Sequence, residues 1–354
     1  MIHQAIRLLA RLRPAPVRLA AGATAAVVAA MAAAAETSPA TGPTFILVQG
    51  AVGEPAYAEA FARQLTAWEE VATRLGATAF VIGRANAAEP AAESDRDLLQ
   101  QRLEAQPAEG AEALWLVLVG HGTFDQNEAR FNLRGDDLTA VELGTWLQRF
   151  QRPVAVINTA SASAPFLAPL SAPGRVIVTA TRSGREQNYT RFGGFFAAAL
   201  GQPATDLDQD GQVTLLEVFL AASASVDEFY RGEGRLATEH ALIDDTGDGL
   251  GTPASWFRGL RAVRKSKQAA ALDGARAHQW LLVPDPAAPV VSPEWRAQRD
   301  TLEAAITALR EQKEQLPADE YYRQLEPLLL ELARWYQSLP APAAGTETDQ
   351  AKGE

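Results

Sequence analysis

Short apolar runs alternate with helical patterns through the first two thirds of the chain, and this order constrains the fold more than any other feature. The runs are almost continuously apolar, as expected of strands that are covered on both faces. We predict strands at Phe45–Gln49, Ala79–Ile82, Leu114–Val119, Val154–Asn158 and Arg175–Thr179. Helical patterns separate them at residues 55–75, 95–105 and 139–149. This order predicts an α/β fold with a mostly parallel sheet wrapped by helices.

A long insert follows the fifth strand, and we expect a sixth strand after it, at Gln279–Val283. The main domain then spans residues 44–291. From residue 292 to 339 the apolar residues recur at spacings of three and four, which predicts two amphipathic helices joined as an antiparallel hairpin. Pro327 lies inside the second helix, so we expect that helix to kink or restart there. Residues 340–354 have the composition of a disordered tail.

The hairpin leaves two interpretations open. Its apolar face either docks on the main domain or supports oligomerisation or the binding of a partner protein through residues 292–339.

The first 35 residues have the pattern of a secretory signal peptide. A start with four arginines and no acid is followed by a small apolar stretch, and Glu36 ends it. Cleavage after Ala35 would leave a linker at 36–43 and change the net charge from −11 to −15. We expect an exported protein, periplasmic or extracellular, with no stable membrane span after cleavage. The alternative is a retained membrane anchor.

The chain contains no cysteine. That count excludes disulfides, cysteine metal sites, lipid anchoring at a cysteine and a cysteine nucleophile. The negative net charge argues against nucleic acid as a partner.

Two polar segments follow neighbouring predicted strands. The third strand ends in Gly120-His121-Gly122, and the fourth ends in Asn158 followed by the serine-rich stretch 159–164. Ligands of open α/β sheets bind at the carboxyl ends of the strands. If the two strands are adjacent, His121 faces the serine-rich turn and is a candidate general base, because histidine titrates near neutral pH.

These two segments resemble the caspase-like superfamily, which includes caspases, metacaspases and legumain-type peptidases. That family has a hydrophobic strand ending in His-Gly and a second strand ending in a motif like Asp-Ala-Cys-x-Ser-Gly. Here Ala160 and Ser163 match directly, and Ser161 stands where the family has its nucleophilic cysteine. A register shifted by one places Ala160 there instead. The resemblance covers about residues 44–260 and implies a caspase-like three-layer sandwich.

Because the chain has no cysteine nucleophile, three functions compete. In the first, which we favour, the protein is a pseudopeptidase whose cleft binds a peptide or protein ligand without cleaving it. In the second, Ser161 and His121 form a working serine hydrolase pair, although a serine hydroxyl needs a well-placed base and an orienting acid. Asp125 is the nearest acid in the sequence. In a third, the protein is a calcium-stabilised interaction module that works through its C-terminal helices.

Residues 206–217 match the calcium-loop pattern D-x-D-x-D-G-x5-E in full. Gly211 supplies the sharp turn, and residues 215–230 form the exiting helix. A set of oxygen ligands suits Ca²⁺ better than zinc, so we predict an EF-hand-like site that acts as a structural clip. The alternative is an acidic surface loop without metal. The predicted ligands are Asp206, Asp208, Asp210, Gln212 through its carbonyl, Thr214 and Glu217.

A second acidic turn contains Asp244, Asp245 and Asp248. Its spacing fits no standard metal loop, so we favour a solvated turn over a second cation site. The resemblance also suggests that Arg182 or Glu186 helps to shape a substrate pocket. We interpret His278 as structural.

Overall fold

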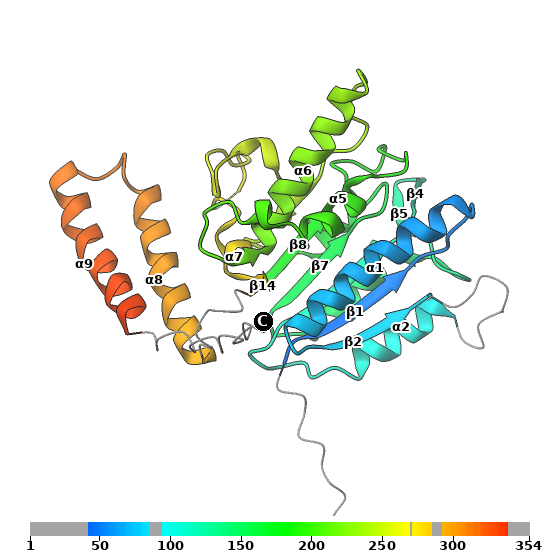
Figure 1. The fold of residues 1–354 in the computed structure, drawn as a ribbon, viewed down its shortest axis with the longest axis horizontal. Helices are drawn as coiled ribbons and strands as arrows, with labels where there is room; N and C mark the ends of the chain where they lie inside the picture. Colours follow the sequence, from blue (N-terminus) through cyan, green and yellow to red (C-terminus); the bar gives the residue numbers. More distant parts are fainter. Residues whose placement is uncertain (1–41, 85–93, 270, 285–291, 339–354) are drawn as a thin grey trace, which may run out of the picture. The chain divides into compact units, whose positions relative to one another are not determined.

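The computed structural model describes residues 42–84, 94–269, 271–284 and 292–338 (Figure 1). The predicted signal peptide, almost all of the linker and the predicted tail lie outside these residues. All five predicted strands are confirmed to within one residue at each end. They are β1 (Thr44–Gln49), β2 (Thr78–Ile82), β3 (Leu114–Val119), β7 (Val154–Asn158) and β8 (Arg175–Thr179).

The main sheet has seven strands in the order β11-β10-β8-β7-β3-β1-β2. The five strands from β2 to β8 are parallel to their neighbours, whereas β10 (Leu242–Asp244) and β11 (Thr252–Pro253) add an antiparallel edge. The strands β3 and β7 are neighbours, and Leu118 pairs with Asn158 at their carboxyl ends. The segments that follow these two strands therefore start side by side.

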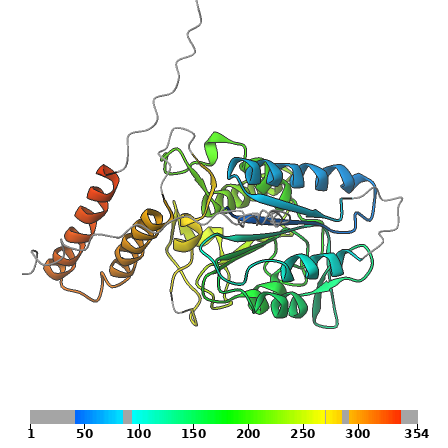
Figure 2. The ribbon, with the colours of Figure 1, turned by 90° about the horizontal axis from the view of Figure 1, so that it is seen from below.

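Helices cover both faces of this sheet, which gives three layers (Figure 2). Side chains alternate between the layers along each strand, as the pleat requires: Phe45 and Leu47 of β1 face one core, and Ile46 and Val48 face the other. One face carries α1 (Ala56–Arg74), α5 (Phe192–Ala199) and α6 (Leu215–Gly232). The other carries α2 (Asp95–Glu104), α3 (Ala140–Leu147) and α4 (Leu167–Leu170).

A small antiparallel sheet follows His121 directly, and the sequence analysis missed it. It consists of β4 (Gly122–Asp125), β5 (Glu128–Phe131) and β6 (Leu138–Thr139). Gln126 and Asn127 form the two-residue turn between β4 and β5, and both have positive φ, at 48° and 71°. Such turns are usually marked by Asn-Gly or Asp-Gly, so Gln-Asn gives a weak signal.

The predicted sixth strand at Gln279–Val283 is present but shorter than predicted. Its start belongs to α7 (Ala275–Gln279), and the strand proper is β14 (Leu281–Val283). This strand pairs antiparallel with β9 (Val213–Thr214) of the acidic loop and lies outside the main sheet. The position beside β8 is taken by β10.

The C-terminal helices form the predicted pair. They are α8 (Pro293–Glu311) and α9 (Ala318–Gln337), and Leu302, Ile306 and Leu309 of α8 are buried. The indole Nε1 of Trp335 in α9 donates to the carbonyl of Trp295 in α8 at 3.1 Å. The expected restart at Pro327 was wrong, because α9 continues through it as one helix.

The remaining described elements are short. One hairpin pairs β12 (Phe257–Arg258) with β13 (Arg261–Ala262), and 3-10 turns occur at Ala164–Phe166, Pro203–Thr205 and Ala254–Trp256. None of the described helices is both long and apolar enough to cross a lipid bilayer.

Candidate functional site

His121 lies just beyond β3 in an aromatic pocket. Its ring packs against Tyr57, Phe61 and Tyr189, with centroid distances of 4.7, 5.2 and 6.0 Å. Nε2 donates to the carbonyl of Val52 at 3.2 Å, since a carbonyl only accepts. Burial lowers the pKa of His121, so the ring is neutral near pH 7 and its lone pair is on Nδ1.

Ser161 is buried beneath the His-Gly segment rather than exposed in a cleft. Its Oγ donates to the Gly122 carbonyl at 2.9 Å and accepts from the Gly122 N–H at 3.2 Å. No hydrogen bond among the described residues joins Ser161 to His121. The approach of the two backbones also requires glycine, because a Cβ at position 122 would lie 2.2 Å from the Ser161 carbonyl oxygen. Ser161 and Gly122 are therefore close neighbours, and the Ser161 hydroxyl is engaged by the Gly122 backbone.

The rest of the serine-rich turn is also held by structural contacts. Ser163 Oγ accepts from the N–H groups of Ala180 and Thr181 at 3.0 and 3.2 Å. Ala160, the other candidate for the nucleophile position, is buried, and its N–H donates to Asn158 Oδ1 at 3.1 Å. In either register the position that would carry a nucleophile is a buried one.

Asp125 lies on β4 and is exposed. No hydrogen bond or ion pair of the described residues joins its carboxylate to His121. Among the described contacts, the ring is held by the Val52 carbonyl and by its aromatic neighbours.

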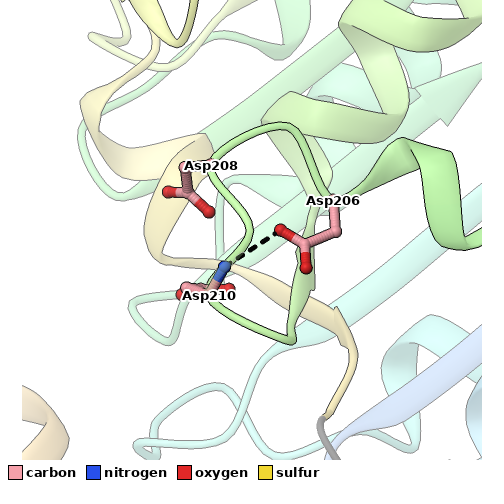
Figure 3. A group of neighbouring side chains, drawn as sticks. All are labelled: Asp206, Asp208 and Asp210. Atoms are coloured by element: carbon pink, nitrogen blue, oxygen red, sulfur yellow. Dashed lines mark hydrogen bonds between the residues drawn. The ribbon is translucent and has the colours of Figure 1, made fainter.

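The acidic loop brings the three predicted aspartates together (Figure 3). One carboxylate oxygen from each of Asp206, Asp208 and Asp210 lies within 4.8 Å of the others. Asp206 holds the turn by accepting from the N–H groups of Asp210 at 3.1 Å and Gly211 at 2.9 Å. Gly211 has a φ of 85°, which accounts for the glycine at this position. The cluster has the oxygen donors and the spacing to hold a cation.

The charge on this loop favours a cation as well. Burial and the charge of Glu217 raise the pKa of Asp208, and burial with the charge of Asp208 raises the pKa of Asp210. These raised pKa values mean that ionising the carboxylates costs free energy in the metal-free protein. A bound cation would reduce that cost. The Nε2 atom of His278 lies 3.8 Å from an oxygen of Asp208.

The other predicted ligands form the start of α6. Glu217 is fully buried, and its carboxylate accepts from Leu207 N at 2.8 Å and from both N and Oγ1 of Thr214 at 2.8 Å. Thr214 and Glu217 thus make a capping box. The backbone N–H of Gln212 donates to Asp210 at 2.8 Å. Glu217 would have to exchange some of these donors to bind a cation with both oxygens.

The expectation of a solvated second acidic turn is wrong for two of its three carboxylates: Asp244 and Asp245 are buried, whereas Asp248 is exposed. Asp244 accepts from Gly247 N and Gly249 N, both at 2.9 Å, and Asp248 accepts from Leu250 N at 2.9 Å. Asp245 accepts from Gly274 N and Ala277 N, at the start of α7. Each carboxylate is directed at its own backbone donors, and among the described residues only the 206–210 cluster has metal-ligand spacing.

Asp273 lies against Asp245 and accepts from the Asp245 N–H at 3.0 Å. Burial, with the charge of Asp245, raises the pKa of Asp273 to about 7. These two aspartates are 28 residues apart, and no sequence motif connects them.

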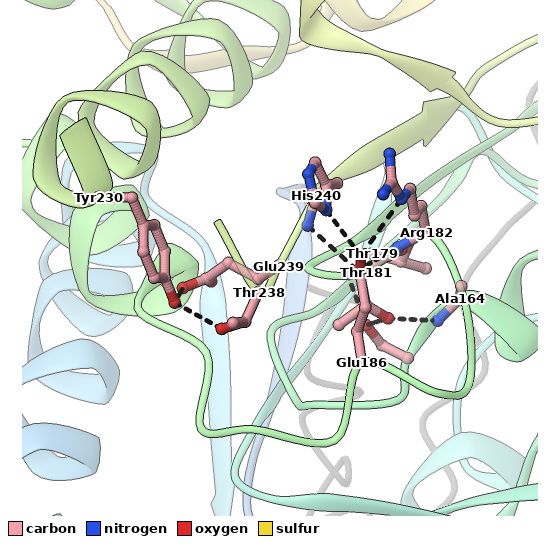
Figure 4. Close-up of polar contacts among 10 residues, drawn as sticks. Ala164, Thr179, Thr181, Arg182, Glu186, Tyr230, Thr238, Glu239 and His240 are labelled. Carbon is pink, nitrogen blue, oxygen red and sulfur yellow. Dashed lines mark hydrogen bonds and ion pairs between the residues drawn. The ribbon is translucent and has the colours of Figure 1, made fainter. Parts of the chain in front are cut away.

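Two glutamates, the buried Glu239 and the partly buried Glu186, link the loops at the carboxyl edge of the sheet (Figure 4). Glu186 accepts from His240 Nδ1 at 2.6 Å and from Arg182 N at 2.9 Å. Glu239 accepts from the N–H groups of Arg191 and Phe192, at the start of α5, and from the hydroxyl of Tyr230. Sequence reasoning missed both roles, because Phe192 lies 47 residues from Glu239 along the chain and His240 lies 54 residues from Glu186.

No protein-family model matches the chain, and no curated protein matches it. Solved structures with distant similarity include the Drosophila initiator caspase Dronc, with 14% identity, a TM-score of 0.37, and coverage of 60% of this chain and 81% of that one. Another is caspase-1 from Spodoptera frugiperda, with 12% identity, a TM-score of 0.37, and coverage of 58% and 86%. Both similarities are distant.

Proposed function

We propose that this chain is an exported caspase-like peptidase homologue without peptidase activity, which acts as a binding or scaffold protein in the cell envelope. One observation carries the proposal: the only hydroxyl in line with the family's nucleophile position is buried and bonded to the Gly122 backbone. Thiolate chemistry is absent as well, because the chain has no cysteine. The pattern of a strand ending in His-Gly beside the serine-rich turn supports the ancestry.

A serine hydrolase needs a base that takes the proton from its hydroxyl as the oxygen attacks. Here the Ser161 proton is directed at the Gly122 carbonyl, and the Nε2 of His121 is directed at Val52. The hydroxyl would have to leave a buried site and lose two hydrogen bonds before it met either a base or a substrate.

The acidic loop supports a calcium-binding role in the same proposal. Three carboxylates converge at one end of the loop. The other end is anchored twice, because β9 pairs with β14 and Thr214 caps α6. A cation here would join the loop to two separate segments and act as a clip. Export supports this reading, since extracellular calcium sites saturate at millimolar calcium.

The test is direct labelling of the full chain with a serine-directed fluorophosphonate, together with cleavage assays on peptide libraries in calcium. We expect no labelling and no cleavage, whereas a serine peptidase run in parallel reacts. Labelling that disappears in Ser161→Ala would overturn the proposal in favour of a Ser161–His121 hydrolase. Mass spectrometry of the envelope fraction checks export, since a processed chain begins at Glu36.

Exposed apolar residues on α9 favour one further candidate function, an interaction module built on the hairpin. Tyr322, Leu329, Leu330 and Tyr336 are 42 to 58% exposed. The measurement is the oligomeric state by light scattering, for the full chain and for Tyr322→Ser with Leu329→Gln and Leu330→Gln. A change from oligomer to monomer would support the hairpin as the working surface.

A further inference from the structure

An open groove of about 940 Å³ lies on the outer face of α1 and α5. Small residues from both helices lie along it, and Tyr230, Arg235 and Thr238 close one side. At one end are Tyr57 and Tyr189, the same rings that pack against His121. The groove therefore begins next to the His-Gly segment and leads away from it. The small residues are Ala56, Ala60, Ala67, Gly194, Ala197 and Ala198.

Three arginines line the groove in a chain whose net charge is −11. Arg63, Arg191 and Arg235 line it, and its described lining contains no aspartate or glutamate. Arg63 pairs only with the exposed Glu59, and an exposed pair of this kind is weak in water. Arg191 stacks on the ring of Phe229 at 4.1 Å, an arrangement that leaves its N–H groups available at the edge of the guanidinium.

From this charge and shape we infer that the groove between α1 and α5 binds an acidic peptide segment of a partner protein. A segment with two or three carboxylates matches the three arginines, and small residues let its backbone approach the helices closely. A long polyanion such as a nucleic acid would meet the negative charge of the rest of the molecule. This inference rests on the proposed binding function and gives it a site and a partner class.

The experiment measures fluorescence anisotropy of a fluorescein-labelled dodecapeptide of alternating Asp and Ala, added to the full chain. A Lys-Ala peptide and an oligothymidylate of similar length are the comparison probes. We expect the Asp-Ala peptide alone to bind. Arg191→Gln with Arg235→Gln should weaken binding by about 5- to 30-fold, because two exposed charge pairs are lost. Arg231→Gln, on α6 but outside the groove, is the matched control and should bind normally.

A second variant tests the groove without touching a charge. A Cβ at Gly194 would meet nothing within 4 Å, so Gly194→Leu fills the groove without a clash. It should abolish binding and leave Tm equal or higher, because glycine is a poor helix former.

Three results would overturn the inference. Peptide binding that survives in both groove variants would place the ligand elsewhere, with the binding function intact. Tighter binding of the oligothymidylate through the same arginines would make the partner a nucleic acid. Absence of any peptide binding would refute the groove as a peptide site. The fluorophosphonate and cleavage assays judge the loss of catalysis independently of these outcomes.

Discussion

Ser161 and Gly122 hold each other through both hydrogen-bonding capacities of the serine hydroxyl. The Oγ donates to the glycine carbonyl at 2.9 Å and accepts from the glycine N–H at 3.2 Å. The contact ties the turn after β7 to the first residue of β4. A position that resembles a nucleophile in sequence is therefore a brace between two segments in the structure.

Removing the hydroxyl should weaken that brace. Ser161→Ala leaves the buried N–H and carbonyl of Gly122 without their side-chain partner, and we expect a loss of about 1–3 kcal/mol in the free energy of unfolding. Urea denaturation measures it. Ser338→Ala is the control, because Ser338 Oγ bonds only a carbonyl at the exposed end of α9. An equal, small effect in both variants would contradict the bracing role.

Glycine at position 122 should be needed for the same contact. Gly122→Ala places a Cβ 2.2 Å from the backbone oxygen of Ser161, so the two segments must separate. We expect a loss of about 1–3 kcal/mol in unfolding free energy, the usual cost of overpacking. Gly194→Ala is the matched control, since its Cβ meets nothing within 4 Å and alanine favours the helix. Thermal melts that rank the two variants the other way would refute this account.

Calcium should stabilise the protein through the acidic loop. A ligand that binds only the folded state adds about 2.7 kcal/mol when its concentration is a hundred times its Kd. We expect Tm to rise with added calcium and to fall with a chelator. The shift should disappear in Asp206→Asn and in Asp208→Asn, which remove charge from the cluster.

Asp248→Asn is the control for calcium, because Asp248 belongs to the second acidic turn and bonds only its own loop. It should keep the calcium shift. An unchanged Tm in the wild-type protein would remove the metal from the proposal, and a shift retained in Asp206→Asn would move the site elsewhere.

Stability should depend on pH through Asp273. Its pKa is raised by burial to about 7, above the usual value near 3.8. Between these values the folded state holds a proton that the unfolded state has released, so the stability falls as pH rises from about 4 to about 7. Asp273→Asn imitates the protonated carboxyl and should flatten this dependence.

The effect of His121 on stability has the opposite sign in part of the same pH range. Burial lowers its pKa, so its contribution to stability grows as pH rises through 6.5. The informative quantity is therefore the difference in unfolding free energy between the wild type and Asp273→Asn, measured in urea at pH 5 and at pH 8. A difference that does not change with pH would show that Asp273 titrates normally.

The apolar runs determined the five parallel strands of the main sheet almost to the residue, but not the antiparallel β10 and β11. Leu114–Val119 and Val154–Asn158 match the structure at both ends, because a strand covered on both faces must be apolar at nearly every position. The three aspartates of the acidic loop were also predictable, since their spacing is local and the turn at Gly211 needs glycine. Patterns of this kind depend on neighbours in the chain, which a sequence contains directly.

Only the tertiary structure decided which distant residues and strands form hydrogen bonds with one another. Whether Ser161 faces His121 or Gly122 depends on how two loops approach, and that approach is set by the β3–β7 pairing and by the missing Cβ at Gly122. The pairing of β14 with β9 joins strands that are about 70 residues apart in the chain and that belong to no common sequence motif. Buried polar groups must find a hydrogen-bond partner wherever the fold brings one near, and that requirement operates between residues the sequence does not place together.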